Sequence, residues 1–181
     1  MRTILFSGVH GVGKGYFLDK TKKYLKHYEV YSASSLIGKY LLATDAGYKK
    51  VSNVKNNQDI LIKAIKKEKG RNLKDFILDG HLCVFNAEGD VERIPEYFFI
   101  DAEINGIVLL QDDPQVICDR ISKRDSKEID INAIKSMQDE EKRYAEELQS
   151  KFHICHIIIS HECSGEQFEE KLKEMEGDFI E

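Results

Sequence analysis

Residues 8–15 have the composition and spacing of a phosphate-binding loop: Gly-Val-His-Gly-Val-Gly-Lys-Gly. Gly8 and Gly13 stand at the spacing that the motif requires before Lys14. Glycine lets the backbone bend around a phosphate because it lacks a Cβ atom, and successive N–H groups then point at the anion. Lys14 is predicted to reach the terminal phosphates of a nucleotide. The residues predicted to bind that nucleotide are the loop and its successor: Gly8, His10, Gly11, Val12, Gly13, Lys14, Gly15 and Tyr16.

A second candidate is Asp79, which ends the run Phe-Ile-Leu-Asp-Gly-His. Three apolar residues followed by an aspartate are typical of a buried strand that carries a carboxylate to its C-terminal edge, where open α/β sheets bind ligands. Asp79 is therefore predicted to hold the Mg²⁺ of a bound nucleotide, directly or through water. The alternative is an aspartate that caps a turn. His81 could contact a phosphate acceptor or orient a loop, and a packed structural histidine is the alternative for it.

Two arginines, Arg120 and Arg124, lie four residues apart on a predicted helix and so share one face. Guanidinium groups bind phosphate through two hydrogen bonds, which suits a cationic cluster that closes on transferring phosphates. The alternative is a pair of surface arginines matched by Asp119 and Asp125.

The elements that must position these side chains alternate along the chain. Residues 3–7, just before the loop, are nearly all apolar and predict a strand that is buried on both faces. The loop leads into an amphipathic stretch that predicts a helix to about residue 28. The other predicted strands are residues 29–32, 76–79, 107–110 and 153–160. The alternation predicts an α/β fold in three layers, with a mainly parallel sheet of about five strands and helices on both faces.

Two further stretches have recognisable patterns. Residues 83–86 and 91–94 flank a short polar segment and predict a hairpin or a loop excursion. In the long helix predicted from about residue 130 to 151, Gln138 and Glu141 interrupt the apolar stripe at helical spacing. These two side chains could face the site, and polar groups at the edge of the packed face are the alternative.

Bulk properties narrow the class of protein. A chain of 181 residues with 33% charged and 41% hydrophobic residues predicts one soluble domain. The net charge of −5 argues against a dedicated nucleic-acid binder. We find no apolar run of membrane-spanning length and no signal-peptide pattern, which predicts a cytoplasmic protein that binds no membrane. The four cysteines show no C-x-x-C spacing and are interpreted as reduced thiols.

The sequence Gly-Lys-Gly in the loop resembles that of adenylate kinases and related nucleoside monophosphate kinases. The chain is most similar to the archaeal-type adenylate kinases and to the small AAA-type ATP-binding proteins of bacteria, and the element order matches over nearly its whole length. The matching motifs are the loop, Asp79-Gly80-His81, and the segment 120–125, which resembles a short lid with paired arginines. The resemblance implies a P-loop NTPase fold, with an acceptor-binding insertion at about 33–70 and a lid at about 120–130. It implies an ATP- and Mg²⁺-dependent kinase in which Lys14, Arg120 and Arg124 are catalytic.

Several positions depart from the family pattern. Tyr16 stands where the family usually has threonine, His10 stands where proline is common, and Lys39 is the nearest basic residue to the usual acceptor-gripping arginine. Asn57 and Gln58 could contact an acceptor base or sugar, and a helix N-cap with its neighbour is the alternative. ATP is therefore the implied donor, and the acceptor is a nucleotide or similar small molecule. The alternative function is a nucleotide-dependent switch or regulatory ATPase that docks a protein partner through the loops at 44–57 and 83–100.

Overall fold

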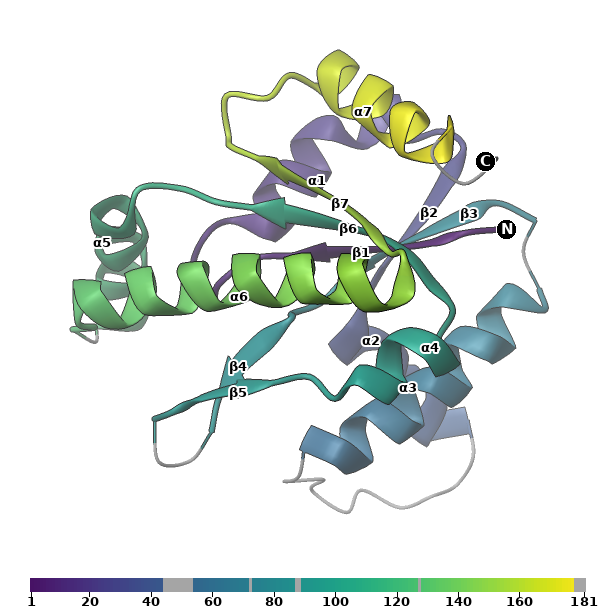
Figure 1. Ribbon diagram of the computed structural model, residues 1–181, viewed down its shortest axis with the longest axis horizontal. Coiled ribbons are helices and arrows are strands. Elements are labelled where there is room, and N and C mark those ends of the chain that lie inside the picture. Colours follow the sequence, from purple (N-terminus) through teal and green to yellow (C-terminus); the bar gives the residue numbers. More distant parts are fainter. Residues whose placement is uncertain (44–53, 72, 87–88, 127, 178–181) are drawn as a thin grey trace.

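The computed structural model describes residues 1–43, 54–71, 73–86, 89–126 and 128–177. A five-stranded sheet forms its centre, in the order β2-β3-β1-β6-β7, and every pairing between neighbouring strands is parallel (Figure 1). This confirms the predicted α/β class and strand number. The strands are β1 (Thr3–Ser7), β2 (Tyr28–Ser32), β3 (Asp75–Asp79), β6 (Ile104–Leu110) and β7 (Cys155–Ile159).

Helices cover both faces of this sheet, as predicted for alternating strands and helices. On one face lie α1 (Lys14–Thr21), the 3₁₀ turn η1 (Lys22–Tyr24) and α7 (Gly165–Gly177) (Figure 1). The opposite face is covered by α2 (Ala33–Ala43), α3 (Val54–Lys69), α4 (Glu96–Asp101) and α6 (Ile131–Phe152), with α5 (Pro114–Asp125) beyond the carboxyl edge. None of the described helices is both long and apolar enough to cross a membrane.

Strand β1 is buried along its whole length, because it lies at the centre of the sheet with helices on both faces. The ring of Phe6 on β1 packs against Phe17 of α1 and Phe168 of α7, with ring centroids 5.6 and 5.7 Å away. Burial of side chains this large stabilises the fold by roughly 2–3 kcal/mol each. The aromatic cluster therefore anchors the helix that carries Lys14.

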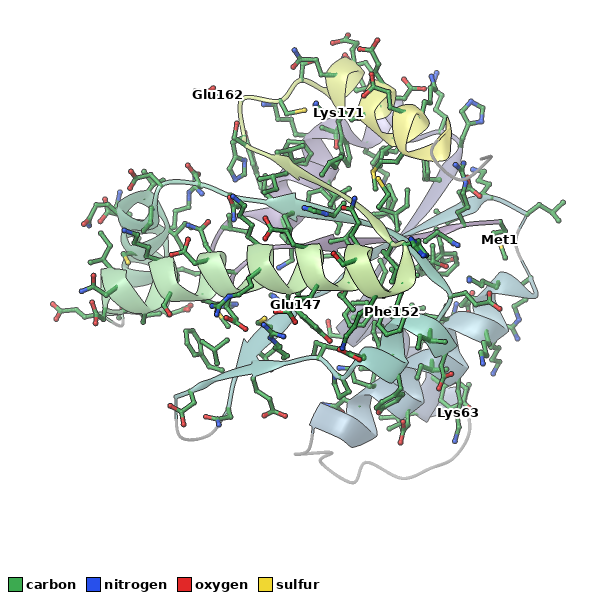
Figure 2. All side chains as sticks on the ribbon, viewed as in Figure 1. Met1, Lys63, Glu147, Phe152, Glu162 and Lys171 are labelled. Atoms are coloured by element: carbon green, nitrogen blue, oxygen red, sulfur yellow. The ribbon has the colours of Figure 1, made fainter. Side chains whose placement is uncertain are left out.

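A two-stranded antiparallel hairpin, β4 (Cys83–Phe85) and β5 (Val91–Arg93), follows β3 and confirms the prediction for this segment. Arg93 joins the hairpin to α6: its guanidinium donates to Glu140 and Glu147 at 2.6 Å and lies 4.6 Å from the ring centre of Tyr144. Glu147 lies on the part of α6 that passes the hairpin (Figure 2).

The starts of α5 and α6 agree with the sequence, whereas the end of the helix after the loop and the start of α3 differ from it. The Asp113 carboxylate accepts from the N–H of Gln115 at 2.7 Å and caps α5, and Asp130 caps α6 in the same way. The helix predicted to reach residue 28 was too long, because Tyr28 instead begins β2 by pairing with Asp75. Helix α3 begins at Val54, earlier than expected, and residues 44–53 of the predicted polar stretch lie outside the described residues.

Candidate functional site

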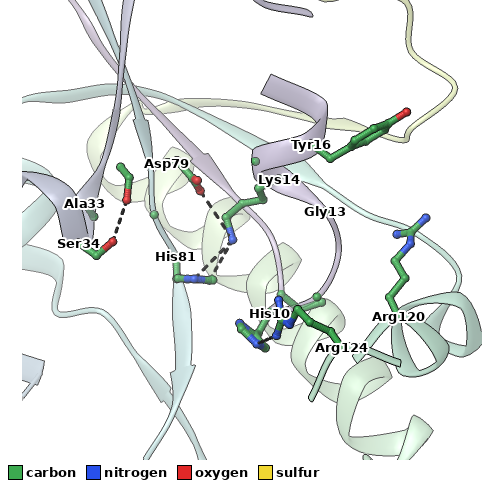
Figure 3. Close-up of a pocket in the computed structure, with 15 residues that line it drawn as sticks. His10, Gly13, Lys14, Tyr16, Ala33, Ser34, Asp79, His81, Arg120 and Arg124 are labelled. Carbon is green, nitrogen blue, oxygen red and sulfur yellow. Dashed lines mark hydrogen bonds and ion pairs between the residues drawn. The ribbon is translucent and has the colours of Figure 1, made fainter. Parts of the chain in front are cut away.

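A pocket of about 560 Å³ opens at the carboxyl edge of the sheet, above β1 and β3 (Figure 3). It is formed by the loop after β1, the start of α2, the corner after β3 and one face of α5. Its lining residues are Val9, His10, Gly11, Gly13, Lys14, Gly15, Tyr16, Ser32, Ala33, Ser34, Asp79, Gly80, His81, Arg120 and Arg124. The pocket thus brings together the loop, Asp79, His81 and both arginines.

The loop has the backbone shape of an anion cradle. Gly13 occupies the position before α1 with φ 96°, a left-handed conformation that L side chains rarely adopt. At Gly11, with φ 84°, a Cβ would come within 2.4 Å of Ile121 Cγ1. These two positions require glycine, and the N-terminus of α1 behind them adds a partial positive charge of about half a unit. The cradle therefore fits a phosphate group.

Lys14 lies within the pocket, on the floor side of the loop. Its Nζ donates to the carbonyl oxygen of Gly8 at 3.0 Å and lies 3.8 Å from Asp79 Oδ1. Burial lowers the pKa of Lys14, and the charges of Asp79 and Glu141 oppose that shift. The ammonium is thus held beside the cradle by the Gly8 carbonyl oxygen and the Asp79 carboxylate.

His81 joins the loop to the corner after β3. Its Nδ1 lies 3.0 Å from the carbonyl oxygen of Gly8, and its Nδ1 and Nε2 lie 3.5 and 3.4 Å from Lys14 Nζ. Because a carbonyl can only accept, Nδ1 carries the proton. Burial, and next the charge of Lys14, lower the pKa of His81 to about 3, so the ring is neutral at physiological pH. This geometry favours the loop-orienting role among the alternatives for His81.

The Asp79 carboxylate points toward Lys14 and the pocket (Figure 3). Burial raises its pKa, and the charge of Lys14 opposes the shift. Its oxygens are hard ligands of the kind that Mg²⁺ takes. Within the described ranges no group of three or more His, Cys, Asp or Glu side chains could hold a metal. A Mg²⁺ bound at Asp79 would therefore take most of its ligands from phosphate groups and water.

The two arginines differ in how firmly they are held. Arg120 donates to the carbonyl oxygen of Val12 at 2.9 Å and forms an ion pair with Asp112 at 2.8 Å. Arg124 contacts His10 in the loop and pairs with Asp125 at 2.7 Å, and its side chain is 54% exposed. The pairing of Arg124 with Asp125 matches the surface-pair alternative, whereas Arg120 is bound to the loop itself. Both side chains nonetheless line the pocket.

A second hollow of about 490 Å³ lies on the other side of the start of α1, between Tyr16, Lys20, Arg120 and His161. His161 Nε2 lies 2.6 Å from the carbonyl oxygen of Val12, so this histidine also holds the loop. Sequence reasoning missed His161, although this residue follows β7 at the same carboxyl edge of the sheet where Asp79 ends β3. It missed Ser32 and Ser34 too, whose hydroxyl oxygens lie 2.8 Å apart in the pocket wall.

Three predicted acceptor residues lie elsewhere. Lys39 on α2 forms an ion pair with Glu68 at 2.8 Å, and Asn57 and Gln58 lie on α3. None of the three lines the pocket around Lys14. Because α3 begins at Val54, Asn57 is also not its N-cap. These three contacts with an acceptor stay predictions.

Comparison with known proteins agrees with this geometry. A family model described as an AAA domain matches residues 7–138. The adenylate kinase of Sulfurisphaera tokodaii (strain DSM 16993 / JCM 10545 / NBRC 100140 / 7) is 29% identical over 140 residues, which are 70% of this chain and 71% of the relative. Among solved structures, the tunicamycin resistance protein of Deinococcus radiodurans superposes with a TM-score of 0.62 at 11% identity. That comparison covers 97% of this chain and 95% of the other, and it shows a shared fold alone. The family match spans most of the chain, and the protein therefore belongs to the AAA domain family as an adenylate kinase-like P-loop NTPase.

Proposed function

We propose that this protein is an ATP-dependent phosphotransferase that moves the γ-phosphate of ATP to a nucleotide or a similar small acceptor. One observation carries the proposal: a single pocket holds the phosphate loop, Lys14, Asp79, Arg120 and Arg124. A binding module needs the loop and the lysine. The two arginines on the far wall are what a transfer reaction adds, because charge develops on the transferring group.

On the donor side, the N–H groups of the loop and the ammonium of Lys14 bind the β- and γ-phosphates. Asp79 is the residue that holds Mg²⁺, directly or through water, and a bound Mg²⁺ neutralises phosphate charge there. The hollow beside Tyr16, Arg120 and His161 opens next to the loop and is large enough to receive the base and ribose.

The arginines act on the phosphates from the α5 side. Asp112 fixes Arg120 against the loop carbonyl of Val12, so this guanidinium is in place before any nucleotide binds. Arg124 is more exposed and can turn from Asp125 and His10 toward a phosphate without breaking a buried contact. No covalent intermediate on the protein is required, because transfer between bound donor and acceptor proceeds in line.

The acceptor is assigned to the wall formed by Ser32, Ala33 and Ser34, opposite the arginines. The two serine hydroxyls can donate to a phosphate or accept from a sugar. This wall begins the insertion at about 33–70, and Lys39, Asn57 and Gln58 belong to helices of the same insertion. We retain them as candidate acceptor contacts.

The test is ADP formation from Mg·ATP in the presence of single candidate acceptors, with AMP and the other nucleoside monophosphates first. A stimulation of at least tenfold by one acceptor supports the proposal. A Lys14→Ala preparation made in parallel must lose the stimulated rate, which excludes a contaminating kinase. Slow hydrolysis that no acceptor changes would overturn the proposal and favour the regulatory ATPase.

A further inference from the structure

We propose that Glu141 on α6 is a positioning residue of this site, which fixes the start of the phosphate loop relative to the corner that carries Asp79 and His81. The inference rests on the proposed function, since it concerns the placement of the same nucleotide-binding groups. Among the described residues, Glu141 makes no hydrogen bond to a pocket-lining side chain, and its hydrogen bonds run instead to the Ser7 hydroxyl and to the N–H of Leu82.

The connection consists of one buried hydroxyl and one buried carboxyl group. Ser7, the last residue of β1, donates its hydroxyl proton to Glu141 Oε1 at 2.8 Å. The same hydroxyl oxygen accepts from the N–H of Leu82 at 2.8 Å, and that N–H also lies 3.4 Å from Glu141 Oε1. Ser7 directly precedes Gly8, and Leu82 directly follows His81. The three groups therefore join the two segments that face each other across the pocket floor.

Burial indicates that this carboxyl group is more than a packing residue. Glu141 is 2% exposed, and a carboxyl group in such a place lowers stability relative to an apolar side chain of similar size. Burial raises the pKa of Glu141 to about 7, against the opposing effects of the Ser7 hydroxyl, the Lys14 charge and the backbone N–H groups of Leu82 and Cys83. If residue 141 only packed α6 against the sheet, a leucine would stabilise the fold more than a glutamate does.

One turn earlier, Gln138 makes a second polar contact from the same face of α6. Its Oε1 accepts from the N–H of Asp112 at 3.2 Å, and its Nε2 donates to the carbonyl oxygen of Asp112 at 3.1 Å. The carboxylate of Asp112 holds Arg120. Adjacent turns of α6 thus hold the loop floor and the arginine partner. Gln138 and Glu141 are both buried, and neither side chain lines the pocket around Lys14.

Four variants test the role: Glu141→Leu, Glu141→Gln, Ser7→Ala and the double variant Ser7→Ala/Glu141→Leu. Glu140→Gln is the matched control, since this neighbouring acid on α6 pairs with Arg93 instead of the site. The readouts are the Kd of ATP by calorimetry, kcat with the best acceptor, and the midpoint of thermal unfolding. Small displacements of catalytic groups lower rates by up to about 100-fold, so kcat is expected to fall more than affinity.

We expect Glu141→Leu to remain folded, yet to bind ATP at least threefold more weakly and to turn over at least tenfold more slowly. Ser7→Ala should lose activity in the same way, and the double variant should be no worse than the poorer single variant, because both changes break one connection. Glu141→Gln keeps an acceptor for Ser7 and should recover part of the rate. Glu140→Gln should match wild type in kcat and in the Kd of ATP.

Wild-type kcat and ATP affinity in Glu141→Leu, or losses that add in the double variant, would overturn the inference while leaving the proposed function intact. Should Glu141→Leu fail to fold, Ser7→Ala and Glu141→Gln decide by the same criteria. A wild-type protein that binds ATP but transfers phosphate to no acceptor defeats the proposed function, and the calorimetric comparison then still tests Glu141. A wild-type protein without affinity for ATP defeats both.

Discussion

The Nζ atom of Lys14 lies 3.0 Å from the carbonyl oxygen of Gly8, the residue with which the same loop begins. The loop is therefore closed on itself by its own lysine, and His81 shares the same carbonyl at 3.0 Å. The ammonium of Lys14 therefore lies beside the phosphate cradle, where it is partly desolvated and forms an ion pair with Asp79. Its removal should affect binding and folding in opposite directions.

Lys14→Met should abolish phosphate transfer and weaken ATP binding by at least 100-fold, while the free energy of unfolding stays the same or rises. The second expectation follows from the lowered pKa of Lys14, which shows that the folded state disfavours its charge. Calorimetry with ATP and urea unfolding measure the two effects. Lys63→Met, at an exposed position on α3, is the control and should change neither. A Lys14→Met protein with appreciable turnover would contradict the assignment.

Alanine substitutions of Arg120 and Arg124 should differ in their effects on kcat and on the Kd of ATP. Arg124→Ala is expected to lower kcat by 10³-fold or somewhat less with little change in the Kd of ATP, because this exposed side chain is needed when charge develops. Arg120→Ala should also weaken ATP binding, because it removes the hydrogen bond to the Val12 carbonyl. Steady-state kinetics and calorimetry on both variants, with the exposed Lys123→Ala as control, make the comparison. Wild-type turnover in Arg124→Ala would rule out its role.

His81 should make stability depend on pH. Its pKa is about 3 in the folded protein and about 6.5 when unfolded, so the unfolded chain binds the extra proton between these values. The stability associated with neutral His81 is complete above pH 6.5 and is lost as pH falls toward 3, by at most about 1.4 kcal/mol per pH unit. Urea unfolding at pH 7.5, 6 and 5 measures the slope.

The comparison with His81→Asn isolates this contribution, since both proteins share the lowered pKa of His156 and the raised pKa values of Glu141 and Asp79, which act in opposite directions. The change of stability with rising pH below pH 6.5 should be more positive in the wild type than in the variant. Parallel slopes would show that His81 is not held neutral.

Two glycines of the loop should respond oppositely to alanine. In Gly11→Ala the new Cβ meets Ile121 at 2.4 Å on a backbone with φ 84°, and we expect a loss of about 1–3 kcal/mol. In Gly15→Ala the Cβ meets nothing within 4 Å and lies in α1, so the free energy of unfolding should rise by about 0.5–1 kcal/mol. Denaturant unfolding of the two variants checks this, and equal effects would contradict the described loop conformation.

Much of the fold could be predicted because the strands are short apolar runs, and because Lys14 begins a helix and Asp79 ends a strand. Lys14, Asp79 and Arg120 meet in one pocket because parallel strands send their carboxyl ends to one edge. His161 was missed because nothing in its local sequence shows that it reaches back to the carbonyl of Val12. The helix after the loop was overextended at residue 28, where pairing with β3 outweighs the helical periodicity.

Among the predicted site residues, those expected to contact the phosphate acceptor agreed least with the pocket in the structure. Lys39 was selected as the nearest basic residue to an expected arginine, yet its ammonium pairs with Glu68 on the neighbouring helix. Helical spacing defines which residues share a face but not which face of α2 turns toward the pocket. Ser32 at the end of β2 and Ser34 at the start of α2 line the pocket wall instead, and a serine pair has no distinctive sequence pattern.

The central place of β1 also has a consequence for hydrogen exchange. Its amides are bonded between two neighbours and lie under helices on both faces, so the strand that carries the phosphate loop should exchange only on global unfolding. The opposite wall begins with α2, in which Leu36 is the one fully buried residue between Ala33 and Ala43. We therefore expect the amides of α2 to exchange faster than those of β1. The two walls of one pocket should thus differ in their rates of hydrogen exchange.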